Sequence, residues 1–184
     1  MTWRLFYSYS HRDAQLRDDL GTYLAPLRQQ NKITEWHDRK IEPGADWEHE
    51  ISERLDSSDL NLFLVSPYFL ASDYCFGVEV DRALARLKRH KAKVVPILLS
   101  PCLWQESRLS ELQMIPRDAK PVTNWPSLGE AFTEVAGEIR QLVSEPVPSP
   151  PTSSLEPVGH RFHASLDRTH PADGADIHNH AWHR

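Results

Sequence analysis

Residues 60–66, Leu-Asn-Leu-Phe-Leu-Val-Ser, stopped by Pro67, form the strongest strand signal in the chain. A short, almost continuous apolar run of this kind is typical of a strand that is covered on both faces of a parallel sheet. Similar short runs lie at residues 3–10 (WRLFYSYS), 33–36 (ITEW) and 93–100 (KVVPILLS). In the last of these, Pro96 cannot donate to a ladder and predicts a position near the sheet edge or a bulge.

Longer amphipathic stretches separate these strands. Within residues 13–29, Leu16, Leu20, Leu24 and Leu27 recur at helical spacing, and residues 47–55, 73–91 and 128–143 carry comparable stripes. With a short last strand at residues 120–123, the pattern predicts an α/β fold. We expect a flavodoxin-like parallel sheet of five strands with helices on both faces.

The composition of the 184-residue chain narrows the class of protein. It is 40% hydrophobic and 26% charged with a formal net charge of −5, which argues against wholesale disorder and against a basic surface for nucleic acid or anionic membranes. The two cysteines, Cys75 and Cys102, form no CxxC pair, and neither a signal peptide nor a membrane-length apolar run is apparent. We therefore expect a cytoplasmic protein with no nucleic-acid or membrane partner.

The chain divides into two parts of different composition. Six of the 14 prolines and six of the 10 histidines fall in residues 145–184. We expect a folded domain over residues 1–144, then a Pro/Ser-rich linker and a His-rich disordered tail over residues 145–184. His178, His180 and His183 resemble a metal-binding tract, but no accompanying cluster supports a metal site.

The scarcity of glycine excludes several nucleotide-binding folds. The chain has seven glycines, with no GxGxxG after the first strand and no Walker motif, so a bound dinucleotide cofactor is not expected. A receiver domain would need an acceptor aspartate where the strand at 60–66 ends. Ser66 and Pro67 stand there instead, so a receiver domain is excluded. A GxSxG elbow is also missing, which weakens Ser66 and Ser72 as nucleophiles.

In a sheet of flavodoxin-like order, ligands bind at the carboxyl ends of the first and third strands, here residues 8–11 and 66–69. Glu79 lies about two turns into the helix that follows the third strand, where it can face this crevice. Geometry alone leaves open the alternative that Glu79 is a solvated helix glutamate.

Three motifs then suggest a family. The phrases LFYSYSHRD (residues 5–13), WHDRKIEPGADWEHEI (36–51) and SPYFLASDYCFGVEVDRAL (66–84) resemble, in order and spacing, the signatures of Toll/interleukin-receptor (TIR) domains. The third ends in the family's S-x-x-C-x-x-x-E pattern. The likeness covers about residues 3–144 and is similar to the prokaryotic branch, many members of which hydrolyse NAD.

The resemblance implies that Glu79 is catalytic and stabilises positive charge on the ribose as the nicotinamide bond breaks. It also implies that Tyr9, Ser10 and His11 form a substrate loop, with Trp47 and Trp104 as aromatic rings able to stack on nicotinamide or adenine. Cys75 occupies a position where several active members carry Trp, so stacking there is lost. NAD would be a substrate, and no cofactor is expected.

The function implied is an NAD⁺ glycohydrolase that releases nicotinamide and ADP-ribose or a cyclic isomer, in signalling or defence against phage. By the same analogy, self-association would switch the enzyme on, with residues 42–47 opening the crevice. The alternative is a non-catalytic TIR module that pairs with other TIR domains through that loop and the basic helix end at residues 82–93. A nucleoside-processing transferase would need a second acid near Glu79, which the sequence does not identify.

Overall fold

The computed structural model describes residues 2–37 and 46–146, with only the backbone given for Trp47 and for residues 73–75. The predicted linker and tail therefore lie outside the described residues, apart from Glu145 and Pro146. Most of the predicted mobile loop at residues 42–47 lies outside them as well.

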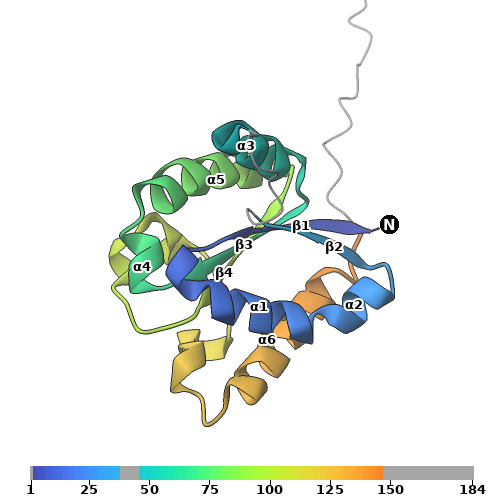
Figure 1. The fold of residues 1–184 in the computed structure, drawn as a ribbon, viewed down its shortest axis with the longest axis vertical. Helices are drawn as coiled ribbons and strands as arrows, with labels where there is room; N and C mark the ends of the chain where they lie inside the picture. Colours follow the sequence, from blue (N-terminus) through green and yellow to red (C-terminus); the bar gives the residue numbers. More distant parts are fainter. Residues whose placement is uncertain (1, 38–45, 147–184) are drawn as a thin grey trace, which may run out of the picture. The chain divides into compact units, whose positions relative to one another are not determined.

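A parallel sheet forms the centre of the fold, in the strand order β2-β1-β3-β4 (Figure 1). Every residue of β3 is buried, as its apolar run predicts, because helices cover both of its faces. The strands are β1 (Trp3–Ser8), β2 (Ile33–Trp36), β3 (Leu60–Val65) and β4 (Lys93–Leu98).

The predicted fifth strand is wrong. Within the described residues the sheet has four strands, and the segment expected at 120–123 forms a 3₁₀ turn, η7 (Val122–Asn124). Pro121 has no N–H to contribute to a ladder, which disfavours a strand there. Val122 is nevertheless fully buried, and Thr123 N donates to Leu99 O at 3.0 Å.

The edge position inferred from Pro96 is confirmed. β4 ends the sheet order, and beyond it Ile115 forms an isolated parallel bridge with Ile97. Ile115 N donates to Pro96 O at 3.0 Å, and Leu98 N donates to Ile115 O at 2.8 Å. The carbonyl of Pro96 thus faces away from β3, so its missing N–H removes no bond between β3 and β4.

Two of the predicted helices are interrupted. Pro26 stands in the first turn of α2, so the helix expected at 13–29 breaks at Leu24. The helix expected at 73–91 begins as a π-helical segment, η3. The helices are α1 (Ala14–Tyr23), α2 (Ala25–Gln29), α3 (Trp47–Ser57), α4 (Pro67–Leu70), η3 (Asp73–Glu79), α5 (Val80–Lys88) and α6 (Leu128–Leu142). Shorter 3₁₀ turns are η1 (His11–Asp13), η4 (Trp104–Glu106), η5 (Arg108–Glu111) and η6 (Arg117–Ala119).

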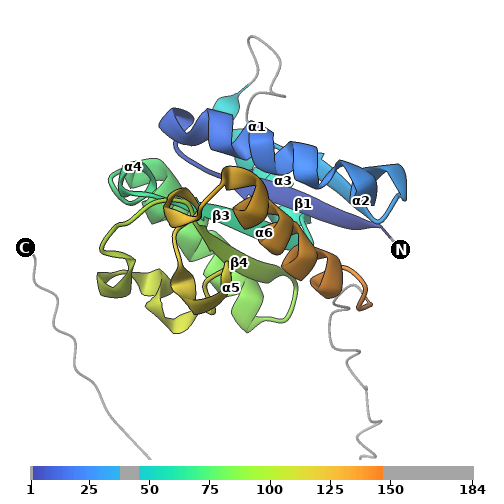
Figure 2. The same ribbon diagram turned by 90° about the horizontal axis from the view of Figure 1, so that it is seen from below.

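The helices form a layer on each face of the sheet, as Figures 1 and 2 show, with α1 and α6 on one face and α3 and α5 on the other. Alternate residues of β1 feed the two cores: Leu5 and Tyr7 join the α1/α6 side, and Phe6 joins the α3/α5 side. The three-layer α/β fold expected from the sequence is therefore confirmed. Within the described residues, no helix is both long and apolar enough to cross a membrane.

Two residues of the basic helix end, Arg82 and Arg86, hold two helices together. Arg86 donates to the carbonyl oxygens of Leu55 and Ser58, at the carboxyl end of α3, the latter at 2.8 Å. Burial lowers the pKa of Arg86, partly offset by the nearby Asp56. Arg82 Nε donates to Asp56 Oδ1 at 2.9 Å. These contacts tie α5 to α3 on the α3/α5 side of the sheet.

Candidate functional site

The end of β1 meets a buried carboxylate. Ser8, the last residue of the strand, is 1% exposed, and its hydroxyl donates to Oε2 of Glu79, which is 4% exposed. These two residues are 71 positions apart in the chain. The fold therefore brings the predicted catalytic glutamate to the carboxyl end of the first strand.

The backbone around Glu79 is fixed by packing on both sides. Glu79 is the last residue of η3, and the next residue, Val80, is fully buried, as is Ala83 one turn later. Earlier in η3, Phe76 lies edge-on to the buried Phe69, with ring centroids 6.4 Å apart. A π segment inside a helix is frequent at functional sites, and here it sets the direction in which the carboxylate leaves the helix.

A second buried acid lies at the end of β3. Ser66, which follows the strand, donates from Oγ to Oδ2 of Asp13 at 2.6 Å and accepts from Phe69 N at 3.0 Å. Asp13, in the η1 turn, is 5% exposed. Burial raises its pKa, and the Ser66 hydrogen bond offsets part of that rise. Because both lone-pair and donor functions of Ser66 are occupied, its role is to position Asp13 and cap α4.

These two pairs lie where the strand order reverses. From β1 the chain first adds β2 on one side and then β3 on the other, so the carboxyl ends of β1 and β3 flank the switch point of the sheet. Each end carries a serine bonded to a buried carboxylate. The site defined by the sequence at residues 8–11 and 66–69 is thus an acidic, hydroxyl-lined end of the sheet.

The predicted substrate loop after β1 makes contacts of its own. Tyr9 is 5% exposed and belongs to the core on the α1/α6 side, with the Arg17 guanidinium 5.1 Å from its ring centroid. His11 is exposed and lies edge-on to Tyr9 at 6.3 Å. Ser10 caps η1, accepting from Arg12 N at 3.4 Å.

The remaining predicted residues are placed less completely. Trp104 lies in η4, half-buried against the core of the α3/α5 side. Trp47 begins α3, whose N-cap Asp46 accepts from His49 N at 3.2 Å, and Cys75 lies within η3. The side chains of Trp47 and Cys75 lie outside the described residues, so their roles stay predictions.

The sequence analysis placed Ser8 at the ligand-binding end of the first strand (residues 8–11) and both Ser8 and Asp13 in the first TIR-like motif, but it gave neither residue a role in the site. Ser8 is a polar residue in a strand that is otherwise mostly buried and apolar, and Asp13 follows it by five positions. A polar residue that ends a buried strand must find a hydrogen-bond partner, which is the signal that would have identified it. Among the described residues, no group of three or more His, Cys, Asp or Glu side chains is placed to hold a metal ion.

The fold and this site define a class: a parallel α/β domain with a carboxylate held at the switch point of its sheet. The family model of the TIR domain matches residues 5–125, and the chain belongs to the TIR domain family.

One relative and two solved structures show the extent of the likeness. The "Uncharacterized protein y4lF" of Sinorhizobium fredii (strain NBRC 101917 / NGR234) is 43% identical over 137 residues, covering 74% of this chain but 42% of that protein. The chain thus spans about two fifths of that relative's length. The TIR domain of the Toll-related receptor TRR-2 from Hydra magnipapillata is 19% identical with a TM-score of 0.53, covering 76% of this chain and 99% of that domain, and shows the same fold. The TIR domains of the activated Roq1 resistosome, 20% identical over 74% of this chain and 84% of theirs, give a TM-score of 0.46, too low to support an inference.

Proposed function

We propose that this TIR domain is an NAD⁺ glycohydrolase in which Glu79 is the catalytic residue. NAD is its substrate and no further cofactor takes part. The products are nicotinamide and ADP-ribose or a cyclic ADP-ribose isomer, and the biological setting is cytoplasmic signalling or anti-phage defence. Tyr9, Ser10, His11, Trp47, Cys75 and Trp104 complete the proposed substrate site.

The chemistry asks for one well-placed carboxylate. The bond between ribose C1′ and the pyridinium nitrogen breaks, both electrons go to nitrogen, and neutral nicotinamide leaves. Positive charge develops on the ribose, where a fixed carboxylate stabilises it or holds the ribose hydroxyls. Water then adds to C1′ and loses a proton, or a group within ADP-ribose itself adds to give the cyclic form.

A single observation carries the proposal: the buried carboxylate of Glu79, fixed by the Ser8 hydroxyl, at the carboxyl end of β1. A carboxylate rarely lies in a protein interior unless it is paired or has a function. The switch point of a parallel sheet is where such folds bind nucleotides. Membership of the TIR domain family adds to this, because the sequence resembles the prokaryotic branch of that family, many members of which hydrolyse NAD.

The 4% exposure of Glu79 also suggests how activity is controlled. A nucleotide reaches this carboxylate only after neighbouring side chains move. We propose that association with further copies of the domain, or with other TIR domains, supplies this rearrangement. Specific activity should then rise with protein concentration.

The test is nicotinamide release from NAD by the purified chain over a range of protein concentrations. We expect Glu79→Gln to reduce release at least about 100-fold. Glu138→Gln is the matched control, since it makes the same change on α6 at a partly buried glutamate on the other side of the sheet. Equal rates for wild type and Glu79→Gln would refute the proposal.

A second candidate is a non-catalytic TIR interaction module. Tyr68, Val78 and Leu103 are 47%, 51% and 78% exposed, all in segments that follow the carboxyl ends of β3 and β4. Large apolar side chains on one end of a domain suit an interface. If wild type releases no nicotinamide at any concentration but self-associates, and Leu103→Ser abolishes association, this second function replaces the first.

A further inference from the structure

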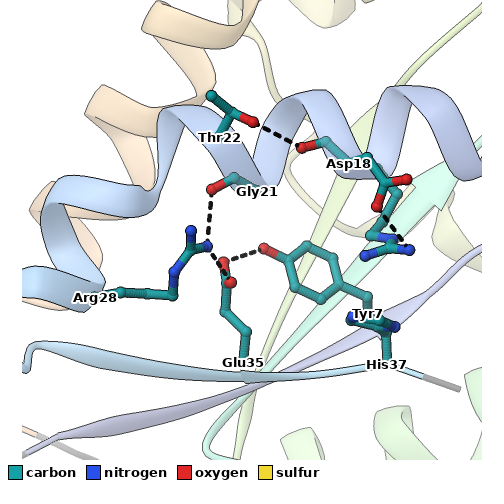
Figure 3. Close-up of a pocket in the computed structure, with 8 residues that line it drawn as sticks. Tyr7, Asp18, Gly21, Thr22, Arg28, Glu35 and His37 are labelled. Carbon is teal, nitrogen blue, oxygen red and sulfur yellow. Dashed lines mark hydrogen bonds and ion pairs between the residues drawn. The ribbon is translucent and has the colours of Figure 1, made fainter. Parts of the chain in front are cut away.

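A polar pocket lies between α1, α2 and β2 (Figure 3). Its volume is about 330 Å³, at the lower end of the range for small-molecule sites. The residues that line it are Tyr7, Arg17, Asp18, Gly21, Thr22, Arg28, Glu35 and His37.

This pocket is separate from the site at Glu79. Tyr7 lines the pocket, whereas the next residue of β1, Ser8, contacts Glu79. Consecutive residues of a strand point to opposite faces of the sheet. The pocket and Glu79 therefore lie on opposite faces. Tyr9, which is also proposed for the substrate site, lies on the pocket face and contacts Arg17, but ligand binding in the pocket does not require NAD cleavage.

Hydrogen bonds link the side chains along one wall of the pocket. Figure 3 shows Glu35 between Arg28 and Tyr7, with its carboxylate turned toward both. Tyr7 Oη donates to Glu35 Oε1 at 2.6 Å, and Arg28 Nη1 donates to Glu35 and also to Gly21 O, the latter at 2.8 Å. Burial raises the pKa of Tyr7 well above its ordinary value, with Glu35 adding to the rise, so the phenol stays a donor. These groups satisfy one another and fix the wall.

Arg17 differs from the rest of the lining. It is 6% exposed, and neither its Nε nor its Nη2 has a hydrogen-bond acceptor among the described residues. Nη2 does lie 2.8 Å from Asp18 Oδ1, a charge contact without hydrogen-bond geometry. The Tyr9 ring lies against the guanidinium, with 5.1 Å from Cζ to the ring centroid. Arg17 is thus held in place with two buried donors unsatisfied.

Those two donors define the ligand chemistry. Nε and Nη2 form one edge of the planar guanidinium, the edge that binds a carboxylate or phosphate through two parallel hydrogen bonds. Buried donors without acceptors are rare in proteins and gain most from an added acceptor. Both atoms are buried and Nη2 already lies against Asp18 Oδ1, so a ligand oxyanion supplies both acceptors once Asp18 turns away and the guanidinium edge opens to the pocket.

The charge of the lining selects between the two oxyanions. Arg17 and Arg28 contribute two positive charges, and Asp18 and Glu35 contribute two negative charges, so the lining is formally neutral with His37 uncharged. A dianion such as a phosphate would face two carboxylates and would compete with Asp18 for a single guanidinium edge. A single negative charge fits better.

We propose that this pocket binds a small organic carboxylate, with Arg17 as the residue that recognises the carboxyl group. The volume leaves room for an acid of several carbon atoms that also carries a hydroxyl. Such a group can use the polar wall formed by Tyr7, Glu35 and Arg28.

The experiment titrates the full chain with lactate and, separately, with inorganic phosphate, in the absence of NAD. The readout is the ¹H–¹⁵N resonance of the Arg17 Nε–H group, identified by its loss in Arg17→Lys, together with calorimetric affinity. We expect lactate to shift this resonance saturably, and Arg17→Lys to weaken the calorimetric affinity at least about tenfold. Arg140→Lys, on the exposed side of α6, is the control and should change the affinity less than about twofold.

A second variant tests the pocket without touching Arg17. A Cβ added at Gly21 meets no atom closer than Arg28 Nη1 at 3.9 Å, so Gly21→Leu can place its side chain there and reduce the space for a ligand. We expect it to weaken lactate binding while the Arg17 resonance of the free protein remains. An unsaturable lactate titration, unchanged affinity in both variants, or tighter binding of phosphate than of lactate would each overturn the proposal.

Discussion

Two serine–carboxylate pairs at the strand ends explain how this protein keeps acids in its interior. Ser8 and Ser66 each donate a hydroxyl to a carboxylate that is at most 5% exposed. A buried carboxylate is tolerated only when its oxygens accept hydrogen bonds. The two buried carboxylates of the site therefore depend on two serine hydroxyl groups, each positioned by the end of a strand.

The Ser8–Glu79 contact should be measurable by a double-mutant cycle. We expect Ser8→Ala to lower the free energy of unfolding by about 1–3 kcal/mol, because Glu79 loses a donor in a buried site. In the double mutant Ser8→Ala/Glu79→Ala, the loss of unfolding free energy should be smaller than the sum of the two single-mutant losses by about 1 kcal/mol or more. Urea unfolding of the four proteins gives the coupling, and strictly additive losses would mean that the hydrogen bond stabilises nothing.

Asp13 should make stability depend on pH. Burial raises its folded-state pKa, so the folded protein holds this proton more tightly than the unfolded chain does. The contribution of Asp13 to stability is therefore complete below the unfolded-state pKa and is lost as the pH rises through the folded-state pKa.

We expect the free energy of unfolding of Asp13→Asn, measured relative to wild type, to be higher at about pH 7.5 than at about pH 4. The reason is that Asn stays neutral and its oxygen still accepts from Ser66. Urea unfolding at the two pH values checks this. A difference between the two proteins that stays constant or shrinks as the pH rises would contradict it.

At the scale of elements, α6 offers a contrast between two helical glycines. A Cβ at Gly137 would meet no atom within 4 Å, whereas one at Gly129 would lie 3.0 Å from Tyr23 Oη. We expect Gly137→Ala to raise the free energy of unfolding by about 0.5–1 kcal/mol, the usual cost of glycine in a helix interior.

Gly129→Ala should gain at least about 0.5 kcal/mol less, because Tyr23 must move and because a first-turn glycine costs less. Thermal unfolding of both variants against wild type makes the comparison. Equal gains would show that the Tyr23 hydroxyl is free to shift.

Helix α1 shows why part of the structure escaped sequence analysis. The leucines at 16, 20, 24 and 27 predict one buried stripe, yet Leu16 is only partly buried while Arg17 is buried with Leu20, Leu24 and Leu27. The true stripe runs through position 17, at spacings of three, four and three. Arginine is seldom buried in proteins, so the pattern predicts that Leu16, and not its neighbour Arg17, faces the core.

At the scale of the whole molecule, what the sequence revealed depends on how local each cause is. The buried strand β3 and the order of strands and helices follow from local runs and were predicted. The end of the sheet was not, because Pro121 prevents a ladder while Val122 still fills the core. In the site, the position of Glu79 followed from its motif, but its bond to Ser8 depends on two segments 71 residues apart. Only the assembled fold brings them together.

Glu145, near the end of the described residues, makes two contacts with the domain that define a testable boundary. Glu145 accepts through its carbonyl oxygen from Trp3 Nε1 at 3.3 Å, and its carboxylate pairs with Lys93 on β4. A chain ending at residue 146 keeps both contacts, and one ending at residue 144 loses both.

We expect the 1–146 protein to melt within about 2 °C of the full chain and to retain its NAD cleavage, since the linker and tail are predicted to carry no part of the core. The 1–144 protein should melt about 3–5 °C lower, corresponding to about 1 kcal/mol for the lost hydrogen bond and ion pair. Lys93→Met in the full chain separates the ion pair from the carbonyl contact, and it should account for less than half of that loss because the Glu145 carboxylate is exposed. If the 1–146 protein fails to fold, residues 147–184 belong to the domain and the boundary predicted from composition is wrong.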